Sequence, residues 1–237
     1  MDASSIAGLT VSAGLLGLIH TLAGPDHYVP FIAMARARRW SLTATLWVTA
    51  LCGVGHLLGS VVLAMLGLSL GVAAGHLQAA ESTRGNVAGW LMLAFGLAYL
   101  AWGVKQAVRN RPHRHVHVHA DGTVHSHLHD HHGDHTHVHT EAKPRSITPW
   151  VLFTIFVFGP CEPMIPLLVL PAARVDGVAA GLVCGTFAVA TLLTMLSVVW
   201  VGYQGIGVIR LRPMERYGHV LAGLTLVACG AAMKLGL

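Results

Sequence analysis

The feature that most constrains this chain is a pattern of prolines and ionisable residues that occurs twice, each time inside a long apolar stretch. Residues 24–36 read GPDHYVPFIAMAR, and residues 159–174 read GPCEPMIPLLVLPAAR. Each copy has a Gly-Pro pair, ionisable residues, a second proline, an apolar run and an arginine. Prolines and ionisable groups are unfavourable in a membrane unless they line a site. Interrupted apolar segments at matching places in two halves therefore indicate a transporter's binding site.

The composition is that of a membrane protein. The mean hydropathy is +0.62, and 11% of the residues are charged, against about 25% in a typical soluble domain. The net charge of +5 does not indicate nucleic-acid binding, because the basic residues lie in short segments between apolar stretches. No basic residue precedes Arg36, so the N-terminal segment is expected to be a first span and not a cleavable signal peptide.

The cysteines do not indicate a secreted disulfide framework, because all four lie within apolar stretches. They are Cys52, Cys161, Cys184 and Cys229.

The hydropathy pattern predicts transmembrane helices, each of which needs about 20 apolar residues. The predicted spans are residues 6–34, 43–70, 87–108, 149–172, 177–203 and 217–236. The first is too long for one straight helix, and we expect Gly24-Pro25 and Pro30 to break it. The second Gly-Pro motif predicts a similar break in the fourth.

The distribution of basic residues predicts the orientation. Twelve of the 15 Lys and Arg residues follow the first, third and fifth spans, and three lie on the other side. By the positive-inside rule, both termini lie outside, in the periplasm, and the long loop after the third span lies in the cytoplasm. We therefore expect an integral protein of a bacterial inner membrane.

The internal similarity extends beyond the proline motifs. Cys52-Gly53 in the second span corresponds to Cys184-Gly185 in the fifth. A weaker match, which alone is no better than chance, aligns Gly89 and Lys105 with Gly218 and Lys234. Because each half has three spans, the halves must insert in opposite senses. The predicted fold is all-α and polytopic: six transmembrane helices in two inverted three-helix repeats with broken helices 1 and 4. The repeats are residues 1–108 and 149–237, joined by a His-rich cytoplasmic loop at 109–148.

Ionisable residues inside the predicted spans are the candidate metal ligands. They are His20, Asp26, His27, His56, Cys161 and Glu162. Imidazoles suit Ni, Co, Zn and Cu ions, and carboxylates in a membrane are functional by default. The prolines also leave backbone carbonyls without helical donors, and a hydrated cation is one partner for them. His56 could instead be a core histidine bonded to a carbonyl, Cys161 could be an apolar filler, and a His–carboxylate pair could relay protons.

Two of these segments resemble known signatures. The run HTLAGPDH at residues 20–27, followed by GVGHLLGS at 53–60, resembles the nickel/cobalt transporter families, the NiCoT and NicO groups. The resemblance implies that His20, Asp26, His27 and His56 are metal ligands or selectivity residues. The GPCEPMIP segment is more similar to the wider LysE-type superfamily, which also contains thiol-electron carriers.

The loop after the third span contains a dense histidine tract, which is typical of metal binding. Its histidines are His113, His115, His117, His119, His125, His127, His129, His131, His132, His135, His137 and His139. With few apolar residues, the loop is expected to be disordered without metal. Alternating histidines could in principle form a strand with one histidine face. The alternatives to metal capture are an expression tag and a solvated loop without a role.

The expected function is transport of a divalent transition-metal cation by alternating access, with Ni²⁺ or Co²⁺ first, Zn²⁺ as a further candidate, and efflux favoured over uptake. The chain has no motif of a soluble enzyme or an ATPase, and no resident cofactor is expected. The expected partners are the lipid bilayer, the metal ion and a cytoplasmic metallochaperone. The alternatives are a thiol-electron carrier of the cytochrome c biogenesis type, a membrane metal-sensing or accessory protein, and an exporter of another substrate such as an organic anion.

Overall fold

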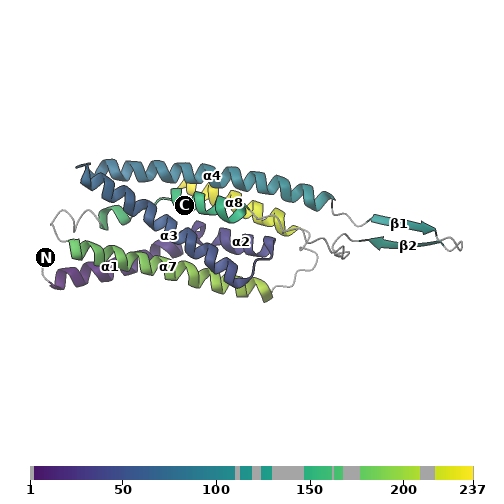
Figure 1. The fold of residues 1–237 in the computed structure, drawn as a ribbon, viewed down its shortest axis with the longest axis horizontal. Coiled ribbons are helices and arrows are strands. Elements are labelled where there is room, and N and C mark those ends of the chain that lie inside the picture. The colour runs from purple at the N-terminus through teal and green to yellow at the C-terminus, as the bar shows by residue number, and fades with distance from the viewer. Residues whose placement is uncertain are drawn as a thin grey trace.

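The computed structural model describes residues 3–109, 113–118, 124–129, 147–161, 163–167, 177–208 and 217–236. Most of these residues form an elongated helical bundle (Figure 1). Its helices are α1 (Ala3–Ala23), η1 (Pro25–His27), α2 (Val29–Arg38), α3 (Leu42–Ser69), α4 (Ala74–Arg109), α5 (Thr148–Phe158), α7 (Gly177–Val208) and α8 (Gly218–Leu235). A hairpin of β1 (His113–Val118) and β2 (Val124–His129) extends from one end of the bundle (Figure 1).

Among the described residues, five helices are long and apolar enough to cross a membrane: α1, α3, α4, α7 and α8. The shorter α5 is also apolar. Large apolar side chains point outward from the bundle, including Trp47 at 71%, Trp90 at 57% and Trp150 at 68% exposure. Such a surface is unfavourable in water over so large an area and is suited to lipid. The fold is therefore an all-helical membrane bundle with one added hairpin.

The first apolar stretch has the break expected at Gly24-Pro25. Helix α1 ends at Ala23, η1 forms a single 3-10 turn, and α2 starts at Val29. Pro25 and Pro30 both occupy the first or second position of a helix, where no N–H is needed. Pro30 therefore begins α2 and does not interrupt it, which differs from its predicted role as a breaker.

The second Gly-Pro motif also ends a helix. The C-cap of α5 is Gly159, whose ψ of 139° turns the chain out of the helix. Helical structure returns at residues 164–167. Glu162 and residues 168–176 lie outside the described residues.

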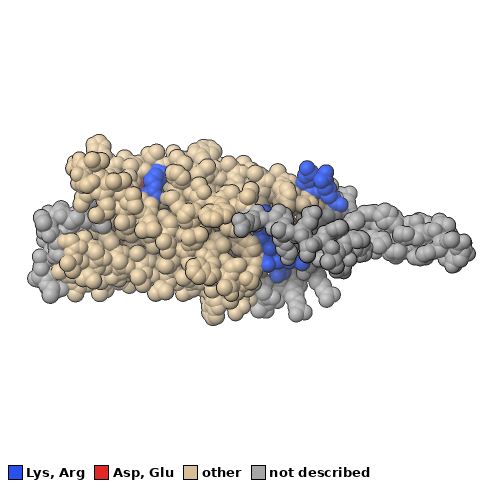
Figure 2. All heavy atoms as spheres, viewed as in Figure 1, with Lys and Arg blue, Asp and Glu red and all other residues tan. Residues whose placement is uncertain are grey.

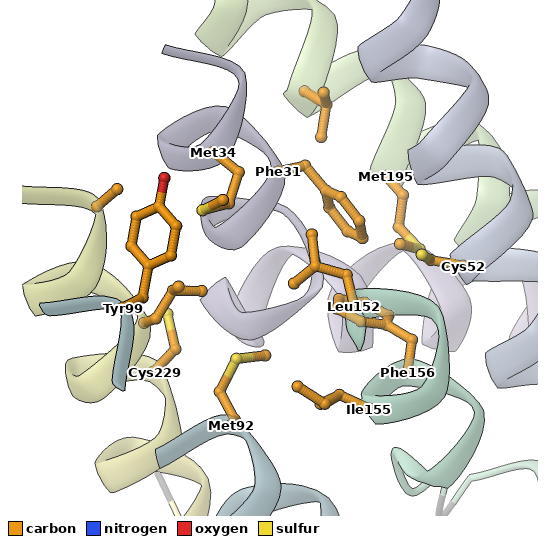
Figure 3. Close-up of a cluster of buried hydrophobic side chains, with 13 residues drawn as sticks. Phe31, Met34, Cys52, Met92, Tyr99, Leu152, Ile155, Phe156, Met195 and Cys229 are labelled. Carbon is orange, nitrogen blue, oxygen red and sulfur yellow. The ribbon is translucent and has the colours of Figure 1, made fainter. Parts of the chain in front are cut away.

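Helix α2 lies at the centre of the packing. It contacts α3, α7 and α8, while α1 packs along α7, α3 along α5, and α4 along α8. Phe31 and Met34 on α2 are fully buried in one apolar cluster, in which Phe31 lies against Phe156 and Met34 points toward Tyr99 (Figure 3). The break in the first stretch thus anchors its second half inside the bundle, next to the end of α5.

Four glycines bring the backbones of α4 and α8 together. A Cβ at Gly96 would lie 2.6 Å from the Val227 nitrogen, and one at Gly223 would lie 2.5 Å from the Leu100 Cα. The same reciprocal pattern recurs further along the two helices, where Gly103 of α4 faces Val220 of α8 and Gly230 of α8 faces Leu93 of α4. Gly223 and Gly230 follow Gly96 and Gly103 by the same 127 residues. The glycine contacts of this interface are therefore two-fold symmetric. Their offset of 127 residues along the chain differs by two from the offset in the predicted alignment of Gly89 with Gly218.

The histidine tract contains strands where disorder was expected. Strands β1 and β2 pair antiparallel, with His113 opposite His129, His115 opposite His127 and His117 opposite His125. The physical reason is the alternation of histidine with other residues, which matches the two-residue period of a strand. The remaining histidines of the tract lie outside the described residues.

The basic residues are distributed unevenly over the bundle. Arg36, Arg38 and Arg39 lie at the end of α2, and Lys105 and Arg109 lie at the end of α4. Figure 2 shows basic side chains near the end that bears the hairpin and a further basic group toward the other end, with no acidic side chain visible on this face.

Candidate metal centre

Three histidines meet at the break in the first apolar stretch. His20 lies in the last turn of α1, His27 ends η1, and His56 lies midway along α3. Their ligand nitrogens all lie within 4.8 Å of one another. The ring centroid of His27 lies 4.8 Å from that of His20 and 5.2 Å from that of His56. His27 and His56 are buried and His20 is partly buried, so the group lies inside the bundle.

The backbone at the break orients His27. Its Nδ1 donates a hydrogen bond of 3.0 Å to the Gly24 carbonyl, which also accepts from the backbone N–H of His27. The Asp26 carboxylate lies 3.3 Å from the same nitrogen. With the proton on Nδ1, the lone pair is on Nε2, and this atom is buried without a hydrogen-bond partner. Such an orienting contact on the second ring nitrogen is characteristic of metal-ligating histidines.

His56 has a similar environment on the other side of the group. The backbone at the end of α5 lies against its ring, because a Cβ at Gly159 would lie 3.0 Å from the His56 Nδ1 and 3.0 Å from the Phe156 carbonyl oxygen. Its Nε2 is also buried and unpartnered, as is the Nε2 of His20. Buried polar atoms without partners are rare in proteins. Three such atoms in one group indicate a site built for a ligand that accepts their lone pairs.

A small cavity of about 10 Å³ adjoins His27 and His56. Its walls include Asp26 and the thioethers of Met92 and Met233. This volume is about that of one water probe. The cavity beside the imidazoles is therefore lined by an acidic residue from the break and by methionines from α4 and α8.

The structure separates the predicted ligand Cys161 from this group. Cys161 is fully buried in an apolar cluster with Leu57, Met164 and Phe187, and it does not belong to the three-histidine group found among the described residues. Glu162 lies outside the described residues, as does half of the auxiliary histidine tract.

Sequence analysis missed a buried ion pair next to the site. Glu81 and Arg84 on α4 form a salt bridge, and Glu81 is fully buried. Both precede the predicted span at 87–108, whereas α4 begins at Ala74. Opposite charges three residues apart at the start of an apolar helix were the available signal. Met92 and Met233 carry no sequence signal that separates them from ordinary core methionines.

Comparison of the chain with protein-family models, with curated proteins and with solved structures gave no match. The functional assignment therefore depends on the residues and geometry of the site itself.

Proposed function

We propose that this protein transports a divalent transition-metal cation across a membrane, with Ni²⁺ or Co²⁺ as the first candidates. The observation that carries the proposal is the group of three histidines whose ligand nitrogens lie within 4.8 Å of one another, each with a buried Nε2 that has no hydrogen-bond partner. Imidazole nitrogens bind late first-row ions and have little affinity for Mg²⁺ or Ca²⁺. The ion is cargo, and no reaction is assigned to the site.

The charges near the histidines favour a divalent ion. A cation is costly in a membrane interior unless anionic groups compensate it. Asp26 supplies one negative charge beside His27. We propose Glu162 as the second, because it follows a Gly-Pro break as Asp26 does. When the ion leaves, two unpaired carboxylates would favour uptake of a proton by one of them, which would couple metal movement to protons.

The ligand chemistry favours late metals over Mn²⁺. The imidazoles are borderline ligands, and the neighbouring Met92 and Met233 sulfurs are soft. Zn²⁺ fits the same ligands. Ni²⁺ and Co²⁺ rank first because of the resemblance of residues 20–27 and 53–60 to the nickel/cobalt transporter signatures.

The proposed mechanism is alternating access between two inverted repeats of three spans. The two-fold glycine contacts of α4 and α8 support this arrangement. So do the matching pairs of α1 with α7 and of α5 with α3. A site near the middle of broken helices is typical of such transporters. His56 lies at the midpoint of α3 and His27 lies at the break.

The proposed orientation places the hairpin end in the cytoplasm, because the described basic residues gather there (Figure 2). Both termini would then lie in the periplasm of a bacterial inner membrane. A cytoplasmic histidine hairpin would capture metal before export, either directly or from a metallochaperone. Efflux is the direction we propose on this basis.

The competing functions share some of these features, and a measurement of metal flux distinguishes them from transport. A thiol-electron carrier needs two reactive cysteines at equivalent places in the halves, and the described cysteines are all buried. A metal-sensing protein would bind the ion at the same histidines and move none.

The test is metal flux in proteoliposomes and metal content in cells, across Ni, Co, Zn and Mn, at matched protein levels. His27→Ala and His56→Ala should each lower flux severalfold or more. His76→Ala is the matched control, because His76 is an exposed histidine on α4. Wild-type flux in both site variants would refute the proposed site.

A further inference from the structure

The buried ion pair of α4 lies one helical turn from the histidine group. Arg84 Nη1 contacts Glu81 and also donates a 3.3 Å hydrogen bond to Ser60 Oγ. Ser60 follows His56 by one turn of α3. Glu81 is fully buried, and the Arg84 side chain is 18% exposed. Paired charges at this depth of a membrane bundle are functional by default, and the histidine site does not use them as ligands.

The ion pair occupies the break that follows α5. In a continuous α-helix, the Cys161 N–H would donate to the Val157 carbonyl. Here the Cys161 N–H donates to Glu81 Oε2 at 3.3 Å, and the Val157 carbonyl accepts from Arg84 Nη2 at 2.7 Å. Glu81 and Arg84 thus supply, between them, the acceptor and the donor of one missing helical hydrogen bond. Arg84 Nη2 also reaches the Gly159 carbonyl at 3.4 Å.

The same backbone segment, residues 156–161, holds His56. The His56 ring lies against this backbone, since a Cβ at Gly159 would lie 3.0 Å from the His56 Nδ1 and 3.0 Å from the Phe156 carbonyl oxygen. On the other side of the segment, α4 packs closely, since a Cβ at Gly85 would lie 2.6 Å from Pro160 Cγ. The segment therefore connects the ion pair to an imidazole of the proposed metal site, and its position determines the direction of that imidazole.

We infer that Glu81 and Arg84 form a clamp that holds residues 156–161 in the broken conformation and thereby positions His56. When the clamp releases, the Cys161 N–H and the Val157 carbonyl become free to form the helical bond. The break then closes, and the backbone that orients His56 moves. Two discrete arrangements of one segment are what a transporter gate requires. The clamp itself does not depend on the proposed cargo, whereas its effect on flux rests on the proposed function.

Cys161 is a built-in reporter of this clamp, because its side chain is fully buried. The experiment uses the full chain with its other three cysteines replaced by alanine. A small membrane-permeant maleimide is applied to membranes without metal, and the labelling rate is measured. Arg84→Gln and Glu81→Gln should each raise the rate about tenfold, the factor that corresponds to about 1.4 kcal/mol. Arg84→Lys should give an intermediate rate, because lysine keeps the charge but loses the fork of donors.

The controls separate the clamp from general destabilisation and from the metal site. Lys105→Gln removes an exposed charge from the same helix and should leave the rate unchanged. The double variant of Glu81 and Arg84 should match a single variant, because the pair acts as a unit. His27→Ala should lower flux severalfold or more and leave Cys161 labelling as in wild type, so a failure of the transport proposal is distinguishable from a failure of the clamp.

Two further measurements complete the test. Ser60→Ala removes only one hydrogen bond of Arg84, so it provides a milder change if the Gln variants fail to insert, and it should raise labelling by a smaller factor. Arg84→Gln should also raise the metal concentration for half-maximal flux, with partial rescue by Arg84→Lys. Unchanged Cys161 labelling in every inserted variant would overturn the clamp.

Discussion

Replacing Asp26 by asparagine tests how far the metal site depends on charge beyond its ligands. The substitution keeps an oxygen near His27 Nδ1, at the position now 3.3 Å away, and removes one negative charge. An ion bound to the His27 Nε2 would lie roughly 6 Å from the carboxylate, where the attraction of a divalent ion at an effective dielectric constant near 20 is about 5 kcal/mol. The desolvation cost of burying Asp26 is the same with and without the bound ion, so it does not affect the affinity. Solvent around the quarter-exposed Asp26 side chain does screen the attraction.

The measured effect should therefore be smaller than the Coulomb value. Removal of an outer contact of a metal-ligating histidine costs about 10- to 100-fold in affinity, which is about 1.4 to 2.8 kcal/mol. We expect Asp26→Asn to raise the metal concentration for half-maximal flux by this factor. Asp26→Glu, which keeps the charge and moves it, should cost less.

The assay is initial flux in proteoliposomes over a range of Ni²⁺ or Co²⁺ concentrations. Flux is preferable to equilibrium binding, because the histidine tract at residues 113–139 would add bound metal unrelated to the central site. Glu141→Gln, which removes a carboxylate from the loop, is the control. An unchanged half-saturating concentration in Asp26→Asn would show that Asp26 neither compensates the ion nor supports His27.

Three further predictions concern other parts of the molecule. Gly223→Ala should destabilise the bundle by about 1–3 kcal/mol through overpacking, because its Cβ would lie 2.5 Å from a backbone atom of α4. Thermal unfolding in detergent measures this change in stability. Gly181→Ala is the control and should be near neutral, because its Cβ would meet open space. Deletion of residues 113–139 should leave flux at saturating metal close to wild type, since the tract lies outside the apolar helices, whereas complete loss in inserted protein would place it in the pathway. Glu162→Gln should abolish or strongly weaken the dependence of metal flux on an imposed pH gradient, and a wild-type pH dependence would make Glu162 a structural residue.

The sequence was sufficient for the parts of the site that depend on local chemistry. A Gly-Pro pair inside an apolar run favours an interruption of the helix, and the interruption places His27 beside His20. Because His56 lies at the middle of an uninterrupted span, its depth in the bundle was also predictable. That its ring meets His27 depends on how α2 and α3 pack, which no spacing along the chain determines.

The ion pair of α4 was missed for a physical reason. Hydropathy treats each charge as a cost, so the charged segment before residue 87 was assigned to a loop. In the structure, Glu81 and Arg84 satisfy one another and the backbone polar groups of a helix that is distant in sequence. Because these partners come together only through tertiary packing, they leave no periodic pattern in the sequence. The histidine strands illustrate the opposite error, in which low apolar content outweighed a visible two-residue alternation.

The fate of the carbonyls freed at the two breaks changes the expected chemistry of the site. From the sequence, these carbonyls were candidates to receive a hydrated cation. In the structure, the Gly24 carbonyl accepts from both the backbone N–H and the Nδ1 of His27, and the Val157 and Gly159 carbonyls at the second break accept from Arg84 Nη2. These oxygens thus already have protein donors, whereas the ligand nitrogens of three imidazoles lie within 4.8 Å of one another. A site of freed carbonyls would favour hard cations such as Ca²⁺, whereas converging imidazoles favour late transition metals. Because the same backbone groups that break the helices also orient the ligands, closure of either break would dismantle the site, and ion release would follow from the conformational change itself.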